Sequence, residues 1–186
     1  MGADYFAGML LNPVVAAFFL VVIAGISSIH YLRNGGAPVV PANRLLPAYA
    51  CALLACAVAS AVMSYVSPEE ALLKWKVPPE NYWNAELNEF FTTYAFAAYA
   101  SLLGIATVGL PVIIHLGRRG LATIPVVLAA ATVISLLLAA LMSVGDSPPF
   151  RHFGALAKEL VYGHLLVAMA FCLGAGLPWR RRNVRT

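Results

Sequence analysis

The chain has 186 residues, of which 61% are hydrophobic and only 11% are charged, against about 25% charged residues in an average soluble domain. This composition excludes an ordinary soluble globular protein, because one core of this size cannot bury so much apolar surface. The formal charge of +4 is no evidence for nucleic-acid binding until the positions of the charges along the chain are known.

Five apolar runs follow one another in the sequence. A helix needs about 20 mostly apolar residues to cross roughly 30 Å of hydrocarbon. The runs lie at about 6–30, 45–66, 90–116, 121–144 and 159–179. They lack the alternating pattern of membrane-spanning strands. The sequence therefore predicts an all-α integral membrane protein with a single membrane domain, 1–186, built as a bundle of five transmembrane helices.

The charges divide between the two sides of this predicted bundle. One side carries eight arginines and no acid: Arg33, Arg44, Arg118, Arg119, Arg180, Arg181, Arg182 and Arg185. The other side carries all eight acids with four basic residues. By the positive-inside rule, the arginine side is cytoplasmic, the N-terminus is outside and the C-terminus is inside. We expect the basic tail 180–186 to anchor this topology and to contact anionic lipid.

Small residues recur at four-residue spacing along the second and third runs. Lipid gives no hydrophobic force between helices, so close packing depends on such residues. The candidate seams are Ala48, Ala52, Cys56, Ser60 and Ser64 in the second run and Thr93, Ala97 and Ser101 in the third, with Ala100 and Gly104 on an adjacent row. Pro111 is the expected position of a local kink in the third run.

The long outer connection, 67–89, has signals of its own structure. Ser67, Pro68 and Glu70 form a capping box with proline in the first turn. We expect short interfacial helices here, the second of which begins near Asn81 and continues into the third span. Its candidate partner-binding residues are Trp75, Tyr82, Trp83 and Glu86. The alternative is that this loop only rests on the lipid headgroups, where Trp and Tyr are common.

The second outer segment, 145–158, also carries a helix-start signature. Asp146 and Ser147 precede Pro148–Pro149, which predicts a helix that continues through 150–153 into the fifth span.

Two histidines lie at the same depth near the cytoplasmic side. His30 precedes Arg33 by three residues, and His115 precedes Arg118 by three. Such a pair on two helices is a candidate ligand set for one b-type haem, or a quinone site. The alternative is that both imidazoles simply lie at the interface beside arginine and water.

His164 is the most unusual residue inside the predicted bilayer, five residues after Glu159 on the fifth span. Ionisable groups at such depth suggest function. A neutral histidine that is hydrogen-bonded to Ser or Tyr on a facing helix is the commoner explanation.

The chain has no Gly-rich phosphate loop, GxSxG, HExxH or paired CxxC motif, so the enzyme classes that these motifs identify have no support. We expect a non-catalytic multi-pass protein of the cell inner (cytoplasmic) membrane. Its partners would be the lipid bilayer and another protein, as a subunit, assembly factor or immunity-type factor of a membrane complex. Two alternatives remain: a redox membrane anchor with haem b or a quinone at His30 and His115, and a small-solute channel or carrier.

Overall fold

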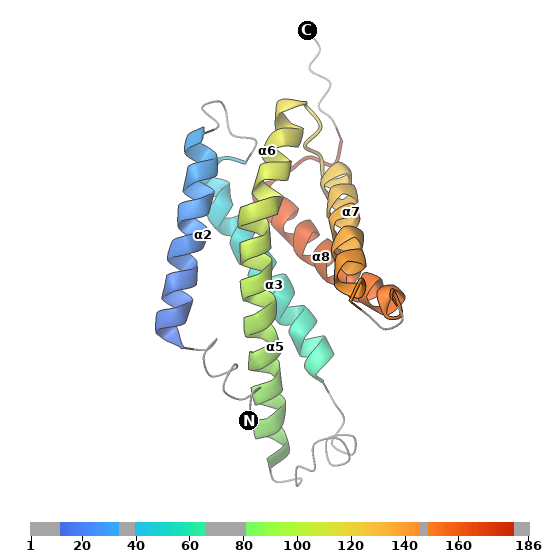
Figure 1. Ribbon diagram of the computed structural model, residues 1–186. Helices are drawn as coiled ribbons and strands as arrows, with labels where there is room; N and C mark the ends of the chain where they lie inside the picture. Colours follow the sequence, from blue (N-terminus) through green and yellow to red (C-terminus); the bar gives the residue numbers. More distant parts are fainter. Residues whose placement is uncertain (1–11, 34–39, 66–80, 146–148, 181–186) are drawn as a thin grey trace.

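The chain is a bundle of long helices. The computed structural model describes residues 12–33, 40–65, 81–145 and 149–180 (Figure 1). Its helical elements are α2 (Pro13–Arg33), α3 (Ala42–Ser64), α5 (Tyr82–Gly104), the π-helix η2 (Ile105–Gly109), α6 (Leu110–Arg118), α7 (Ile124–Ser143) and α8 (Phe153–Ala175). Within the described residues there is no strand. Because helices satisfy all their backbone hydrogen bonds internally, this class of fold suits the apolar composition.

Four helical segments are long and apolar enough to cross a membrane. They are Ala42–Met63, Tyr82–Arg118, Ile124–Ser143 and Phe153–Ala175. In α2, the apolar stretch found among the described residues is shorter, Ala17–His30. The all-helical, membrane-like character predicted from the sequence is therefore present, with four segments that meet the length criterion.

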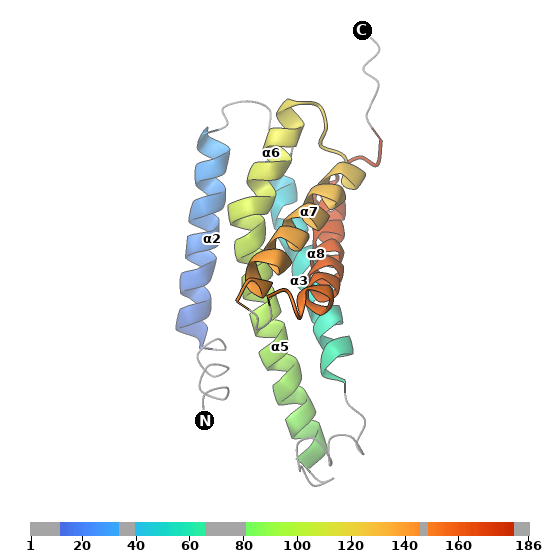
Figure 2. The same cartoon turned by 45° about the vertical axis from the view of Figure 1, so that its right-hand side comes forward.

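Helix α8 packs against both α3 and α7, and α3 also packs against α5, whereas α2 makes smaller contacts with η2, α5 and α6 (Figures 1 and 2). Aromatic contacts link these elements. The rings of Tyr49 in α3 and Phe171 in α8 lie 5.5 Å apart, and those of Phe19 in α2 and Tyr99 in α5 lie 4.8 Å apart. The main core lies among α3, α8, the first turns of α6 and the first turns of α7, where Ala52, Phe171, Leu110 and Ile124 are buried.

The small-residue stripe of α3 lies in a helix seam, as expected. Ala48, Ala52, Cys56 and Ser60 are all buried. The Cys56 thiol lies 3.4 Å from Ser101 Oγ and 3.7 Å from the Ala97 carbonyl oxygen, on α5. The adjacent row of α5 is not part of this seam, because Ala100 and Gly104 are exposed. Ala97 and Ser101 therefore form the side of α5 that meets α3.

The irregularity expected at Pro111 appears one turn earlier, as the π-helix η2. The backbone N–H of Leu110 donates to the carbonyl oxygen of Ile105, five residues back. Proline has no N–H to donate and its ring crowds the carbonyl four residues before it, here that of Thr107. The missing hydrogen bond and the crowding at Pro111 are accommodated by a wider helical turn in the five residues of η2, which precede the proline.

The prediction of a helix through 150–153 is wrong. Residues 149–152 form turns and α8 begins at Phe153. Phe150 has a left-handed backbone, with φ of 64°, and its N–H donates to the Ser143 carbonyl oxygen over 2.9 Å. This bond ties the start of the turn back to the end of α7, which a continuous helix would not allow.

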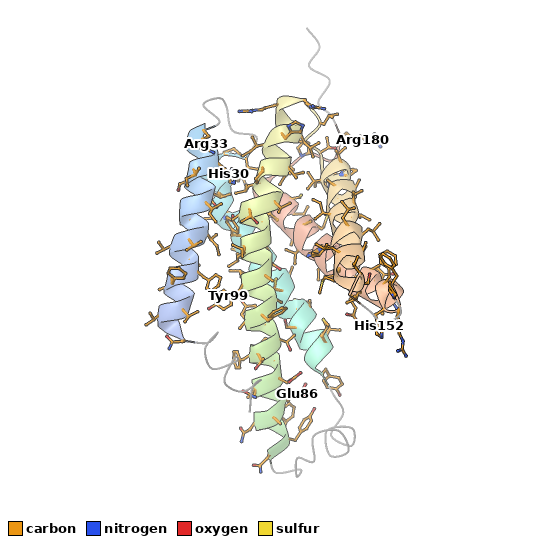
Figure 3. The ribbon with its side chains drawn as sticks, in the orientation of Figure 1. His30, Arg33, Glu86, Tyr99, His152 and Arg180 are labelled. Carbon is orange, nitrogen blue, oxygen red and sulfur yellow. The ribbon has the colours of Figure 1, made fainter. Side chains whose placement is uncertain are left out.

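The two ends of the bundle differ in charge. Figure 3 shows Arg33 and Arg180 at one end, with His30 nearby, and Glu86 at the opposite end. The C-terminus of α6, with Arg118, also lies at the first end (Figure 1). We call these the arginine end and the Glu86 end.

Candidate functional sites

The first candidate site is a polar pair between α7 and α8. Ser135 is fully buried, and its Oγ lies 2.7 Å from Nδ1 of the half-buried His164. The same Oγ donates to the Ala131 carbonyl oxygen over 2.7 Å. His164 therefore has the kind of partner expected from the sequence, a serine on a facing helix.

These two hydrogen bonds fix the tautomer of His164. A serine hydroxyl has one hydrogen, and the Ala131 carbonyl oxygen can only accept one. When both hydrogen bonds are made, the hydroxyl hydrogen goes to Ala131 and the neutral imidazole donates from Nδ1–H to Ser135 Oγ. In the neutral ring, Nε2 is then left with its lone pair as a hydrogen-bond acceptor.

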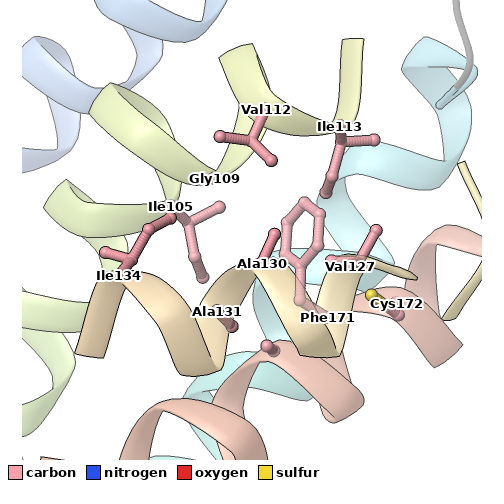
Figure 4. A pocket seen from close by; sticks show the side chains of 11 residues that line it. Ile105, Gly109, Val112, Ile113, Val127, Ala130, Ala131, Ile134, Phe171 and Cys172 are labelled. Carbon is pink, nitrogen blue, oxygen red and sulfur yellow. The ribbon is translucent and has the colours of Figure 1, made fainter. Parts of the chain in front are cut away.

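An apolar cavity of about 70 Å³ lies between η2–α6, α7 and α8 (Figure 4), and Ala131, whose carbonyl oxygen accepts the hydrogen bond of Ser135, is one of its lining residues. Its walls include Ile105 and Gly109 at the two ends of η2, Val127 and Ala131 of α7, and Phe171 of α8. Helix α7 packs closely on α8 but makes few contacts with α6. The cavity therefore lies where η2 faces α7. Bulges of the π type are frequent at functional sites.

The second candidate site is the end of α5 at the Glu86 end. The continuous helical segment Tyr82–Arg118 has 37 residues, about 55 Å at 1.5 Å per residue. It extends beyond the other described helices at this end (Figures 1 and 2). On this extension, Trp83, Leu87 and Phe91 are 71%, 50% and 48% exposed, and their four-residue spacing places them on one face. We call these three residues the α5 stripe.

The predicted partner-binding residues have different surroundings. Trp83 belongs to the α5 stripe, whereas Tyr82 is only 7% exposed and its ring packs edge-on against Trp83. Glu86 is half-buried, and its Oε2 is buried without a hydrogen-bond partner. Trp75 lies outside the described residues. Leu87 and Phe91 are not among the residues predicted from the sequence. Their four-residue spacing from Trp83 could have identified them as residues on the same helix face.

The candidate haem ligands lie on neighbouring helices. His30 is half-buried on α2 and His115 is exposed on α6, and these two helices touch. Glu159 is exposed near the start of α8. Among the described residues, there is no group of three or more His, Cys, Asp or Glu side chains that could hold a metal ion.

Comparison of the chain with protein families, with curated proteins and with solved structures finds no match. The functional argument therefore depends on the two sites themselves.

Proposed function

We propose that the protein is a multi-pass protein of the inner (cytoplasmic) membrane that acts by binding another protein through the α5 stripe. The observation that carries this proposal is the length of the segment Tyr82–Arg118. Its 37 residues exceed the 20 or so that a membrane crossing needs. Even a strongly tilted helix leaves several turns outside the hydrocarbon core.

The surroundings of the α5 stripe support a site outside the hydrocarbon. Asn84, Asn88 and Glu89 share this end of α5 and are exposed, and such side chains are costly within lipid. An exposed row of Trp, Leu and Phe among polar residues is typical of a protein-binding surface, because burying large apolar side chains supplies most of the binding energy. A partner segment with an apolar face fits this row.

The proposed topology has five spans, namely α2 and the four longer apolar segments. The arginine end faces the cytoplasm, since Arg33, Arg118 and Arg180 gather there and positive residues favour the cytoplasmic side. The α5 stripe then faces the opposite compartment, together with its partner.

Site-specific photocrosslinking tests the proposed function. A photoreactive phenylalanine analogue at Leu87 is expected to give one discrete protein adduct in native membranes. The same analogue at Glu89, which is exposed on the other side of α5, is the matched control and should give little of this adduct. Trp83→Ala should reduce the Leu87 adduct at least fivefold. Equal adducts at both positions, or no effect of Trp83→Ala, would contradict the proposal.

A further inference from the structure

The pair Ser135–His164 lies one helical turn beyond Ala131 and Ala168, which line the apolar cavity. Along α8, His164, Ala168, Phe171 and Cys172 recur at the spacing of one helix face, and the last three line the cavity. Along α7, Ala131 lines the cavity and Ser135 follows one turn later. On both α7 and α8, the residue of the polar pair therefore lies one turn from a residue that lines the cavity. On both helices this turn is on the side toward the Glu86 end.

His164 Nε2 lacks a donor within the part of the chain that the structure describes. The ring is held by Ser135 at Nδ1, and in the neutral ring with Nδ1–H the other nitrogen, Nε2, is a hydrogen-bond acceptor. In hydrocarbon no water is present to donate to it, and an unsatisfied polar group there costs free energy. A ligand with one hydrogen-bond donor would remove this cost.

We propose that the cavity and His164 together form a binding site for a lipid-soluble hydroxy compound, such as a phenol or a quinol. Its apolar part would lie between η2 and α7, and its hydroxyl would donate to Nε2 of His164. A cavity of about 70 Å³ holds only part of such a molecule, and the remainder would lie in the lipid along α7. This site is independent of the α5 stripe and of the proposed protein partner.

Binding of two fluorinated probes to the purified full-length protein in detergent tests this proposal. The probes are 4-fluorophenol, which has the donor, and 4-fluoroanisole, in which a methyl group replaces the hydroxyl hydrogen. Titration followed by fluorine NMR gives Kd for each. We expect a Kd for the phenol at least tenfold lower than for the anisole. Similar Kd values in the wild type would overturn the proposal.

Variants separate the polar contact from the apolar one. His164→Phe keeps a ring of similar size, and Ser135 keeps its bond to Ala131, so the helix pair should stay folded. It should abolish the difference between the two probes. Ala131→Leu fills the cavity and should weaken both probes at least fivefold. Ala129→Leu is the matched control, because Ala129 is exposed on the same helix, and it should change neither Kd.

Retention of the probe difference in His164→Phe, or unchanged affinity in Ala131→Leu, would exclude this site. Helix content and gel-filtration profile show whether each variant is folded. If Ala131→Leu fails to fold, Ala130→Val takes its place, because Ala130 also lines the cavity and the change adds only two methyl groups. It should weaken both probes about twofold, and an unchanged affinity would again exclude the site.

Discussion

Gly174 of α8 lies directly against the backbone of Ala48 of α3. A Cβ atom added to Gly174 would lie 2.6 Å from the Ala48 Cα and 2.7 Å from the Pro47 carbonyl oxygen. Ala48 itself has no exposed surface. The two helices can come this close only because both residues are small, which is the way that helices associate in lipid.

Gly174→Ala is therefore expected to destabilise the bundle. The added methyl group meets backbone atoms, which cannot move aside as a side chain can, so α3 and α8 must separate. Overpacking of this kind costs about 1–3 kcal/mol. Unfolding in detergent with increasing dodecyl sulfate measures the change.

Gly163→Ala is the matched control for Gly174→Ala, because Gly163 is on the same helix and nothing lies within 4 Å of an added Cβ. It should be neutral or stabilise the protein by up to about 1 kcal/mol, the difference in helix propensity between Gly and Ala. Equal effects of the two substitutions would show that α3 and α8 are not in contact at Gly174.

A double-mutant cycle on Ser135→Ala and His164→Phe should give a favourable coupling energy. The hydrogen bond of 2.7 Å joins two helices, and side-chain hydrogen bonds between membrane helices average about 0.6 kcal/mol. The same unfolding assay measures the four proteins of the cycle. Ser143→Ala in place of Ser135→Ala is the comparison, because Ser143 bonds only within its own helix and to Phe150 through its backbone. Its coupling with His164→Phe should be close to zero, and a similar coupling for both serines would contradict the assigned contact.

Phe150→Gly should stabilise the protein. Phe150 has φ of 64°, a conformation that costs a residue with a Cβ about 1 kcal/mol and that glycine adopts freely. Its side chain is 52% exposed, so little packing is lost. Thermal unfolding should show a higher midpoint for Phe150→Gly and a lower one for Phe153→Gly, where glycine enters the first turn of α8. A lower midpoint in both variants would mean that the Phe150 side chain contributes more than its backbone conformation costs.

Cysteine labelling should reveal the topology. Asn88→Cys at the Glu86 end and Arg119→Cys at the arginine end both replace exposed residues. In cells whose inner membrane is intact and whose outer envelope lets the reagent through, a membrane-impermeant maleimide should label the cysteine at the Glu86 end. It should not label the cysteine at the arginine end. Disruption of the membrane should make the cysteine at the arginine end reactive. The wild type is the control for labelling of the native cysteines Cys51, Cys56 and Cys172, which are free and lie within helices. The reverse labelling pattern would invert the proposed orientation.

Much of the fold follows from the sequence because the relevant forces are local. An apolar run of about 20 residues must form a helix in lipid, since only a helix satisfies its backbone hydrogen bonds within the run. The stripe from Ala48 to Ser60 likewise predicts a helix seam, because small side chains allow close approach. The sequence also predicts Trp83 as an interfacial or partner-binding residue, and its side chain is exposed.

Other features depend on contacts between segments that are distant in the chain. Ser135 is one small polar residue in an apolar run, and only the packing of α7 on α8 makes it the partner of His164. The burial of Tyr82, the extension of α5 beyond its neighbours and the turn at Phe150 have the same origin.

The sequence by itself therefore determined the helical class, the division of charge between the two ends and the small-residue seam. Only the tertiary structure decided which helices are neighbours, that Ser135 meets His164, and that an apolar cavity lies one helical turn from this pair. The physical reason is that helix formation in an apolar run requires only bonds within that run. A cavity or an interhelical hydrogen bond requires several helices to approach at particular positions, and that approach depends on all of their surfaces together.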